Sequence, residues 1–261
     1  MASIDKVRRD LRARNNSLDG ITDDLVNDLE KYQSEYEKLL LKENFDLDDG
    51  NLKRTSKNFE RATSINPMKE LGYEDISKDW VGKYPEVAKG QIAFNKGIGV
   101  ESDLKFKDFT LVKVYQGVDL GAMLAEGRSI DALIKRELVN AIALEDNYKT
   151  TVDNISLAYL GQGEKLGQAA NWADSVMRTS VFGLTRSIDK QIYEDIGEDK
   201  FIYVGALDKR TRDFCRARVG QEFTNEQIEE FGALNGSGLP GFFSPGGYRC
   251  RHSMIGASTI D

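Results

Sequence analysis

The two cysteines of this 261-residue chain, Cys215 and Cys250, lie in its last fifth, together with its only histidine, His252. Cysteine sulfur and histidine nitrogen are ligands of zinc, and the same groups act as nucleophile and base in covalent catalysis. Cys215 lies within "LDKRTRDFCRARVG" (207–220), and the other two lie within "GGYRCRH" (246–252). These two segments therefore hold the side chains best suited to chemistry.

Three interpretations of this cluster are open. In the first, Cys215, Cys250 and His252 bind zinc, with Asp208 or Asp213 as fourth ligand, although the chain lacks the C-x₂-C spacing typical of zinc sites. In the second, one cysteine is a nucleophilic thiolate, activated by His252 and by neighbouring arginines. In the third, two reduced cysteines pack as small apolar side chains beside a hydrogen-bonded histidine. The weak spacing favours the third interpretation, in which the cluster fastens a small module.

Basic side chains crowd around both cysteines. An arginine guanidinium binds phosphate well, so the basic patch predicts phosphate contacts, but it could equally pair with acidic groups of the chain itself. The candidates for phosphate contact are Arg210, Arg212, Arg216, Arg218 and Arg249. The net charge is −7, and it lies wholly in residues 1–200, because acids and bases balance in residues 201–261. An acidic chain binds duplex DNA poorly, so we expect structural pairing for most of these arginines.

Composition and the N-terminus limit the class of protein. Apolar residues make up 40% of the chain and charged residues 30%. The first twenty residues lack the apolar core of a secretory signal, and no stretch approaches the roughly 18 apolar residues that span a membrane. Two cysteines do not make a disulfide scaffold. We expect a soluble protein, made in a reducing cytoplasm, with no membrane span.

Apolar periodicity predicts a helical body. The stripe of residues 19–43 has helical spacing, and it either packs on its own domain or docks on a partner protein. Its members are Ile21, Leu25, Leu29, Tyr32, Tyr36, Leu39 and Leu40. Residues 129–146, with Ser129 as N-cap, and residues 171–197, ending at Gly197, repeat the pattern. Residues 109–117 fit either a strand or a helix.

The last sixty residues have a different sequence pattern. Residues 201–208 are strand-like, 225–234 suit a short helix, and 235–248 form a loop rich in glycine and proline. The fold class is therefore mainly α, with a helical N-terminal body and a small C-terminal α+β module. We divide the chain into an N-terminal helical segment (1–75), a mostly helical middle region (76–170) and a C-terminal module (171–261). The module includes a compact α+β tail (199–261).

Turn chemistry predicts how the two cysteine segments meet. Asp208 is placed to accept hydrogen bonds from the amides of the turn that follows it. Gly246 and Gly247 allow the chain to reverse direction. That reversal would return Cys250 and His252 to the side of Cys215.

The order of these features resembles the Mu F-like family of phage minor head proteins, also called head morphogenesis proteins. A helix that carries Arg178-Thr179 leads into a short strand, then a D-x-R-T-like turn with a cysteine, a variable loop and a closing C-R-C or C-R-H tail. The resemblance covers about 171–257, a third of the chain, and the remaining two thirds carries no matching motif. The matching residues are Asp208, Arg210, Thr211, Cys215, Gly220, Phe223, Cys250, Arg251 and His252, in a segment that also holds Gly247.

This resemblance implies a structural, non-enzymatic protein of the virion, located in the capsid interior near the portal after synthesis in the host cytoplasm. It implies action in head assembly, DNA packaging or DNA ejection, with the portal protein and other head proteins as partners and an oligomeric state set by the portal. Packaged DNA would be touched locally through the arginine patch. The resemblance implies no cofactor, and it leaves a zinc site at the cluster open. The competing predictions are an injected effector enzyme that uses Cys215, Cys250 and His252, and a nucleic-acid-binding accessory protein.

Overall fold

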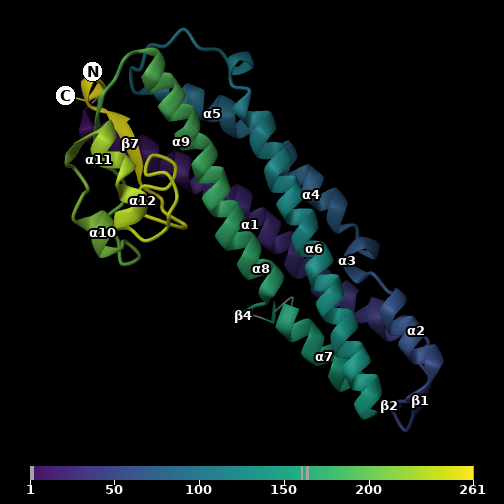
Figure 1. Ribbon diagram of the computed structural model, residues 1–261. Helices are drawn as coiled ribbons and strands as arrows, with labels where there is room; N and C mark the ends of the chain where they lie inside the picture. Colours follow the sequence, from purple (N-terminus) through teal and green to yellow (C-terminus); the bar gives the residue numbers. More distant parts are fainter. Residues whose placement is uncertain (1–2, 160, 163–164, 261) are drawn as a thin grey trace. The chain divides into compact units, whose positions relative to one another are not determined.

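The computed structural model describes residues 3–159, 161–162 and 165–260. Helices make up most of these residues, and the sheets are small (Figure 1). The predicted fold class, mainly α with a small C-terminal α+β module, is confirmed. None of the helices in the described part of the chain combines the length and the apolar character needed to cross a membrane.

The elements follow one another with short connections. The helices are α1 (Ile4–Lys42), α2 (Ser56–Ser64), α3 (Pro67–Glu70), α4 (Tyr73–Gly82), α5 (Tyr84–Gly97), α6 (Leu111–Leu144), α7 (Tyr148–Tyr159), α8 (Gln168–Trp172), α9 (Arg178–Asp195), α10 (Asp213–Arg216), α11 (Asn225–Glu229) and α12 (Phe231–Leu234). The strands are β1 (Leu47–Asp48), β2 (Asn51–Leu52), β3 (Gly161–Gln162), β4 (Lys165–Leu166), β5 (Lys200–Val204), β6 (Glu222–Thr224) and β7 (Ser253–Gly256). Single turns of tighter or wider helix occur at Phe106–Asp108, Ala173–Met177 and Ala257–Thr259.

The chain forms two compact units, each built from segments that are distant in sequence. Unit 1 comprises Met1–Thr22, Gly82–Gly117 and Ser175–Asp261, and unit 2 comprises Asp23–Val81 and Val118–Asp174. The sequence pattern suggested three successive segments, whereas each of these units combines segments that are separated in the sequence. Two long helices, α1 and α6, contribute residues to both units.

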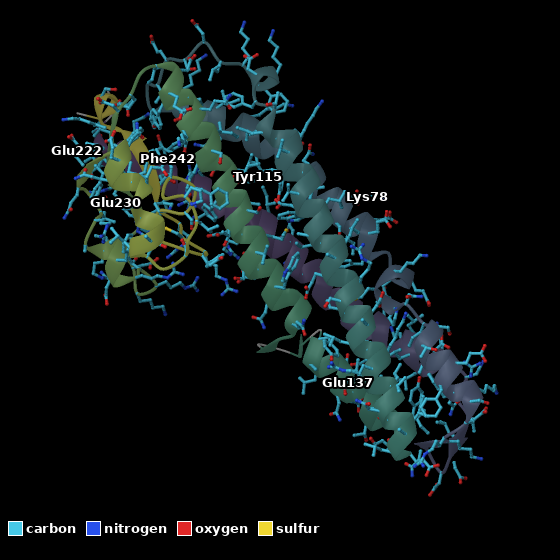
Figure 2. All side chains as sticks on the ribbon, in the orientation of Figure 1. Lys78, Tyr115, Glu137, Glu222, Glu230 and Phe242 are labelled. Carbon is cyan, nitrogen blue, oxygen red and sulfur yellow. The ribbon has the colours of Figure 1, made fainter. Side chains whose placement is uncertain are left out.

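Unit 2 is held together by apolar side chains at helical spacing. In α6, Ile130, Ile134, Leu138 and Ile142 are buried, as their spacing predicts. Leu25 and Leu40 of α1 are also buried, so these members of the 19–43 stripe pack within the chain. The side chains of Leu29, Tyr32 and Tyr36 lie outside the described residues. The polar face of this unit is solvated: Lys78 projects from α4 and pairs with Glu74 one turn away (Figure 2).

The bounds of the long helix α6 bear on two expectations from the sequence, the state of residues 109–117 and the N-cap at Ser129. Residues 109–117 are helical from Leu111, and Ser129 is an interior residue of the same helix, not an N-cap. The buried side of α6 runs through Asp119, Met123 and Gly127, where it is not uniformly apolar. A Cβ at Gly127 would lie 2.7 Å from the ring of Tyr73, so the glycine makes room for that ring. The apolar pattern is interrupted there, although the helix is not.

Unit 1 contains a three-stranded antiparallel sheet in the order β6-β5-β7. Strand β5 is central, with Phe201 opposite Phe223 on one side and Gly256 on the other. Phe201 packs edge-on against Tyr193 of α9 and against Phe242. Helix α9 contacts both α5 and β7 and runs beside the C-terminal strands (Figure 1). This packing places the cysteine segments against α9.

Candidate functional site

The cysteines and the histidine lie together in unit 1. Cys215 belongs to the single-turn helix α10, and Cys250 and His252 immediately precede β7. Their ligand atoms all lie within 4.8 Å of one another, and all three residues are buried. Central strand β5 adds Tyr203, whose hydroxyl is 3.9 Å from the Cys250 sulfur. Two segments about 35 residues apart in sequence thus form one cluster.

Hydrogen bonds fix the ring of His252. Its Nε2 is 3.1 Å from the carbonyl oxygen of Ala206, and its Nδ1 is 3.7 Å from the Cys250 sulfur. A carbonyl accepts but cannot donate, so Nε2 carries a proton, and Nδ1 is the ring nitrogen that faces the cluster. The ring also packs closely on Gly205, where a Cβ would lie 2.1 Å from a ring carbon. These contacts hold the ring in one orientation.

The two thiols have opposite pKa shifts. The hydrogen bond to Cys250 and burial raise the pKa of the Cys215 thiol. Burial also acts to raise the pKa of Cys250, but hydrogen bonds from Cys215 and His252 and the charge of Arg186 outweigh it and lower that pKa. Burial raises the pKa of the Tyr203 phenol. Negative charge is therefore favoured on the Cys250 sulfur, with protons on its neighbours.

Arg186 of α9 is a part of the site that sequence reasoning missed. Its side chain is fully buried, and its Nε donates to the carbonyl of His252 at 2.9 Å. Its two terminal nitrogens donate to the carbonyls of Phe243 and Cys250. The available signal was a charged residue one helical turn after the apolar Phe182, on the side of the helix that faces the core. Arg186 fixes the backbone on both sides of Arg251.

The predicted turn at Asp208 has the expected chemistry. Its Oδ1 accepts from the backbone N–H of Arg210 at 2.8 Å, and its backbone N–H donates to the hydroxyl of Thr211. Its Oδ2 accepts from the Arg251 guanidinium at 2.7 Å. Hydrogen bonding from Arg251 lowers the pKa of Asp208 to about 2. Both carboxylate oxygens are thus engaged, and within the described residues Asp208 is not part of the group of potential metal ligands.

Two of the predicted phosphate-binding arginines bind backbone carbonyls instead. Arg212 donates to the carbonyl of Gly246 at 2.6 Å and to that of Tyr248 at 2.5 Å. Arg216 donates to the carbonyls of Asp208 and Thr211. Arg212 thus joins the segment that holds Cys215 to the loop that precedes Cys250, and Arg216 holds the turn that begins at Asp208. They fit the expectation that most of the arginines pair within the protein.

The remaining arginines of the patch are placed differently. The Arg218 guanidinium lies 3.6 Å from the centre of the Phe214 ring and donates to that residue's carbonyl. Arg249 has a left-handed backbone (φ +58°), and its N–H donates to the hydroxyl of Thr179 in α9 at 3.1 Å. Arg210 is exposed. Arg212, Arg216 and Arg249 are exposed as well, and Arg218 is half-buried.

The motif glycines have specific backbone roles. Gly220 and Gly247 adopt left-handed conformations with φ of +86° and +85°, which favour glycine. Gly220 donates its N–H to the carbonyl of Tyr203 at 2.8 Å as the chain turns toward β6. Gly246 lies against the cluster, because a Cβ there would be 2.4 Å from the Cys215 sulfur. The site therefore depends on close approach of bare backbone.

No family model matches this chain, and no curated protein or solved structure is significantly similar to it. The case for a function therefore rests on the residues described above.

Proposed function

We propose that this chain is a minor head protein of a tailed bacteriophage, of the Mu F-like kind. It would lie in the capsid interior near the portal and act in head assembly, DNA packaging or DNA ejection. Its partners would be the portal protein and other head proteins. The role is structural, and the C-terminal module is the part that carries the resemblance.

The observation that carries this proposal is that three separated motif segments are bonded into one structure. Thr179 of the helix that carries Arg178-Thr179 accepts from the backbone of Arg249 in the closing tail. In the same helix, Arg186 donates to the tail on both sides of Arg251. The turn is joined to that tail through the ion pair of Asp208 with Arg251. Residues matched only by their order in the sequence thus act together in the fold.

Burial of the cluster supports a structural role over an enzymatic one. Cys215, Cys250 and His252 are 2%, 4% and 4% exposed, respectively. A nucleophile must reach its substrate, and a general base must reach the proton that it removes. With glycine backbone packed on both the sulfurs and the imidazole, substrate has no direct path to these atoms.

Charge supports contact with protein in preference to general DNA binding. Arg212, Arg216 and Arg218 already bond the module's own carbonyls. The whole chain carries a net charge of −7, which repels phosphate over distances of about 10 Å at 0.1 M salt. Exposed Arg210 leaves room for a local contact with packaged DNA.

The test is quantitative mass spectrometry of purified particles of the phage or prophage that encodes this chain. Copies of the chain are scaled to the portal protein, before and after DNA release. We expect a small, fixed number of copies per portal, and a fall in that number on release would make the chain an ejected component.

The same count is made on an Arg186→Ala phage, because this change removes the bonds that join α9 to the closing tail. We expect fewer copies of the chain per portal in this variant, whereas the exposed Arg136→Ala change in unit 2 should leave the number unchanged. Absence of the wild-type chain from washed particles that contain normal amounts of portal protein would refute the proposal.

A further inference from the structure

The cluster of two cysteines and one histidine has the donor set of a zinc site. The Cys215 sulfur, the Cys250 sulfur and a nitrogen of His252 lie within 4.8 Å of one another in the interior of unit 1. Structural zinc is most often held by such combinations of thiolate and imidazole. We propose that Cys215 Sγ, Cys250 Sγ and His252 Nδ1 bind one zinc ion, with Tyr203 Oη facing the fourth position. This inference does not depend on the proposed role in the phage head.

The orientation of His252 supports this assignment independently of the sulfurs. A histidine that binds metal through one nitrogen usually donates the proton on the other to a carbonyl or carboxylate. Here Nε2 donates to the Ala206 carbonyl at 3.1 Å, so Nδ1 is the nitrogen that remains to bind a metal ion. That nitrogen lies 3.7 Å from the Cys250 sulfur, in the interior of the protein. The hydrogen bond from Nε2 to Ala206 fixes the ring in the position that a metal ligand requires.

The separations between donor atoms fit one tetrahedral ion. Zinc–sulfur and zinc–nitrogen bonds of about 2.3 and 2.0 Å put a sulfur and a nitrogen ligand about 3.5 Å apart at the tetrahedral angle. The distance from Cys250 Sγ to His252 Nδ1 is 3.7 Å, and that from Cys250 Sγ to Tyr203 Oη is 3.9 Å. A contraction of a few tenths of an ångström would bring these two separations to bonding geometry, and Cys215 Sγ, within 4.8 Å of the other ligand atoms, would move closer as well.

The bare face of Gly246 gives a further indication that the donors converge. A Cβ at this residue would be 2.4 Å from Cys215 Sγ, 2.7 Å from Cys250 Sγ and 3.0 Å from Tyr203 Oη. Two sulfurs and an oxygen thus point at one small region that no side chain fills. Arg212 holds the Gly246 carbonyl and so keeps this backbone in place. The sequence suggested Asp208 or Asp213 as the fourth ligand, but Tyr203 supplies the oxygen that lies here.

A bound zinc ion would also balance the charge of two ionised sulfurs. Two buried thiolates would repel each other strongly without a counter-charge, whereas Zn²⁺ neutralises both. The Arg186 guanidinium near Cys250 is spread over three backbone carbonyls and compensates at most one negative charge. With zinc bound, both sulfurs can be thiolates in the interior of the protein.

The first experiment measures metal in the intact chain, purified without a metal-affinity tag from zinc-supplemented cells. Elemental mass spectrometry should find one zinc per chain after dialysis. Exchange of that zinc for Co²⁺ should produce a thiolate-to-cobalt charge-transfer band and the strong visible bands of a tetrahedral site. These readouts use the wild-type protein, so they do not depend on whether a variant folds.

Variants then test each ligand. Cys250→Ser and His252→Ala should reduce zinc to background, and Tyr203→Phe should change the cobalt spectrum. Asp208→Asn is the matched control and should retain full zinc, because its oxygens are held by the turn and by Arg251. A folded wild-type chain with background zinc and no charge-transfer band would overturn the proposal, whether its thiols are then free or joined in a disulfide. Full zinc in folded Cys250→Ser would overturn it as well.

Discussion

Unit 2 and the part of the C-terminal module that belongs to unit 1 (residues 175–261) are stabilised in different ways. Unit 2 buries apolar side chains that recur along helices, such as Ile134 and Leu138, so its stability is spread over many equivalent contacts. The module has short strands and long loops, and it concentrates polar bonds on a few residues, with Arg186 and Arg212 each holding backbone carbonyls. Small modules with little core depend on such fixed points. Damage should therefore be gradual in unit 2 and abrupt in the module.

The chain carries a separate natural probe for each region. Both tryptophans, Trp80 and Trp172, belong to unit 2, and both cysteines belong to the module. Tryptophan fluorescence during urea unfolding therefore follows unit 2. Reaction of thiols with an alkylating reagent follows the module, because Cys215 and Cys250 are buried until it opens. The two curves test the comparison in one sample.

The largest effect should come from Arg186→Ala. Three backbone carbonyls in the module would lose their donor, and we expect the free energy of unfolding reported by thiol labelling to fall by about 3–5 kcal/mol. The tryptophan transition should keep its midpoint. The control is Arg136→Ala in α6, where the side chain is 63% exposed and the expected change is below about 0.5 kcal/mol. Equal losses in both transitions would contradict the proposed independence of the two regions.

Leu138→Ala should produce the reverse pattern. Leu138 is fully buried in α6, and truncating such a leucine leaves a cavity that costs about 2–5 kcal/mol. We expect the tryptophan transition to move to lower urea while thiol labelling and zinc content stay the same. Leu144→Ala at the end of the same helix is the control, since Leu144 is 71% exposed. A matching increase in thiol labelling would show that the module depends on the core of unit 2.

The same substitution should have opposite signs in the two regions. Gly246→Ala puts a methyl group against both sulfurs, and overpacking of this kind costs about 1–3 kcal/mol. Gly121→Ala in α6 meets no atom within 4 Å, and it should stabilise the helix by about 0.5–1 kcal/mol. Thiol labelling for the first variant and fluorescence for the second measure these changes. An unchanged thiol-labelling transition in Gly246→Ala would contradict the close approach of this backbone to the cluster.

The sequence predicted the helical core better than it predicted the site. Ile130, Ile134, Leu138 and Ile142 repeat every three or four positions, so local periodicity was enough to place them inside. The start of α6 could not be found in this way, because Asp119 and Gly127 interrupt its buried side. Local pattern determines a helix face, but it does not reveal which distant side chain packs against a glycine on that face, as Tyr73 does at Gly127.

The candidate site shows the same limit. Cys215, Cys250 and His252 were identified by residue type, and the glycine turn predicted their approach. Arg186 and Tyr203 were not identified, since their partners are a carbonyl and a sulfur of a loop about fifty to sixty residues away. Nothing in the order of residues encodes which carbonyls a buried arginine will bind. Rare residue types can be noticed in a sequence, whereas backbone partners become known only from the fold.

The smallest expected effect concerns pH and the ion pair of Asp208 with Arg251. The hydrogen bond from Arg251 lowers the pKa of Asp208 to about 2, below the ordinary aspartate value of about 3.9. The unfolded state therefore binds more protons around and between these values, so the stabilisation is complete above about pH 5 and is lost as the pH falls toward 2. Because the carboxylate side chain is 38% exposed, we expect less than about 1 kcal/mol.

Asp208→Asn isolates this charge, because the amide oxygen can still accept from the N–H of Arg210 and keep the turn. Thermal unfolding of the wild type and the variant should differ by a constant amount from pH 7 to about 5, and the difference should shrink toward zero below about pH 4. The counterpart in unit 2 is Asp46→Asn, which removes a surface pair with Lys57. Thiol labelling should respond to the first change and not to the second. A difference that grew as the pH fell would mean that Asp208 acts in the module through something other than its negative charge.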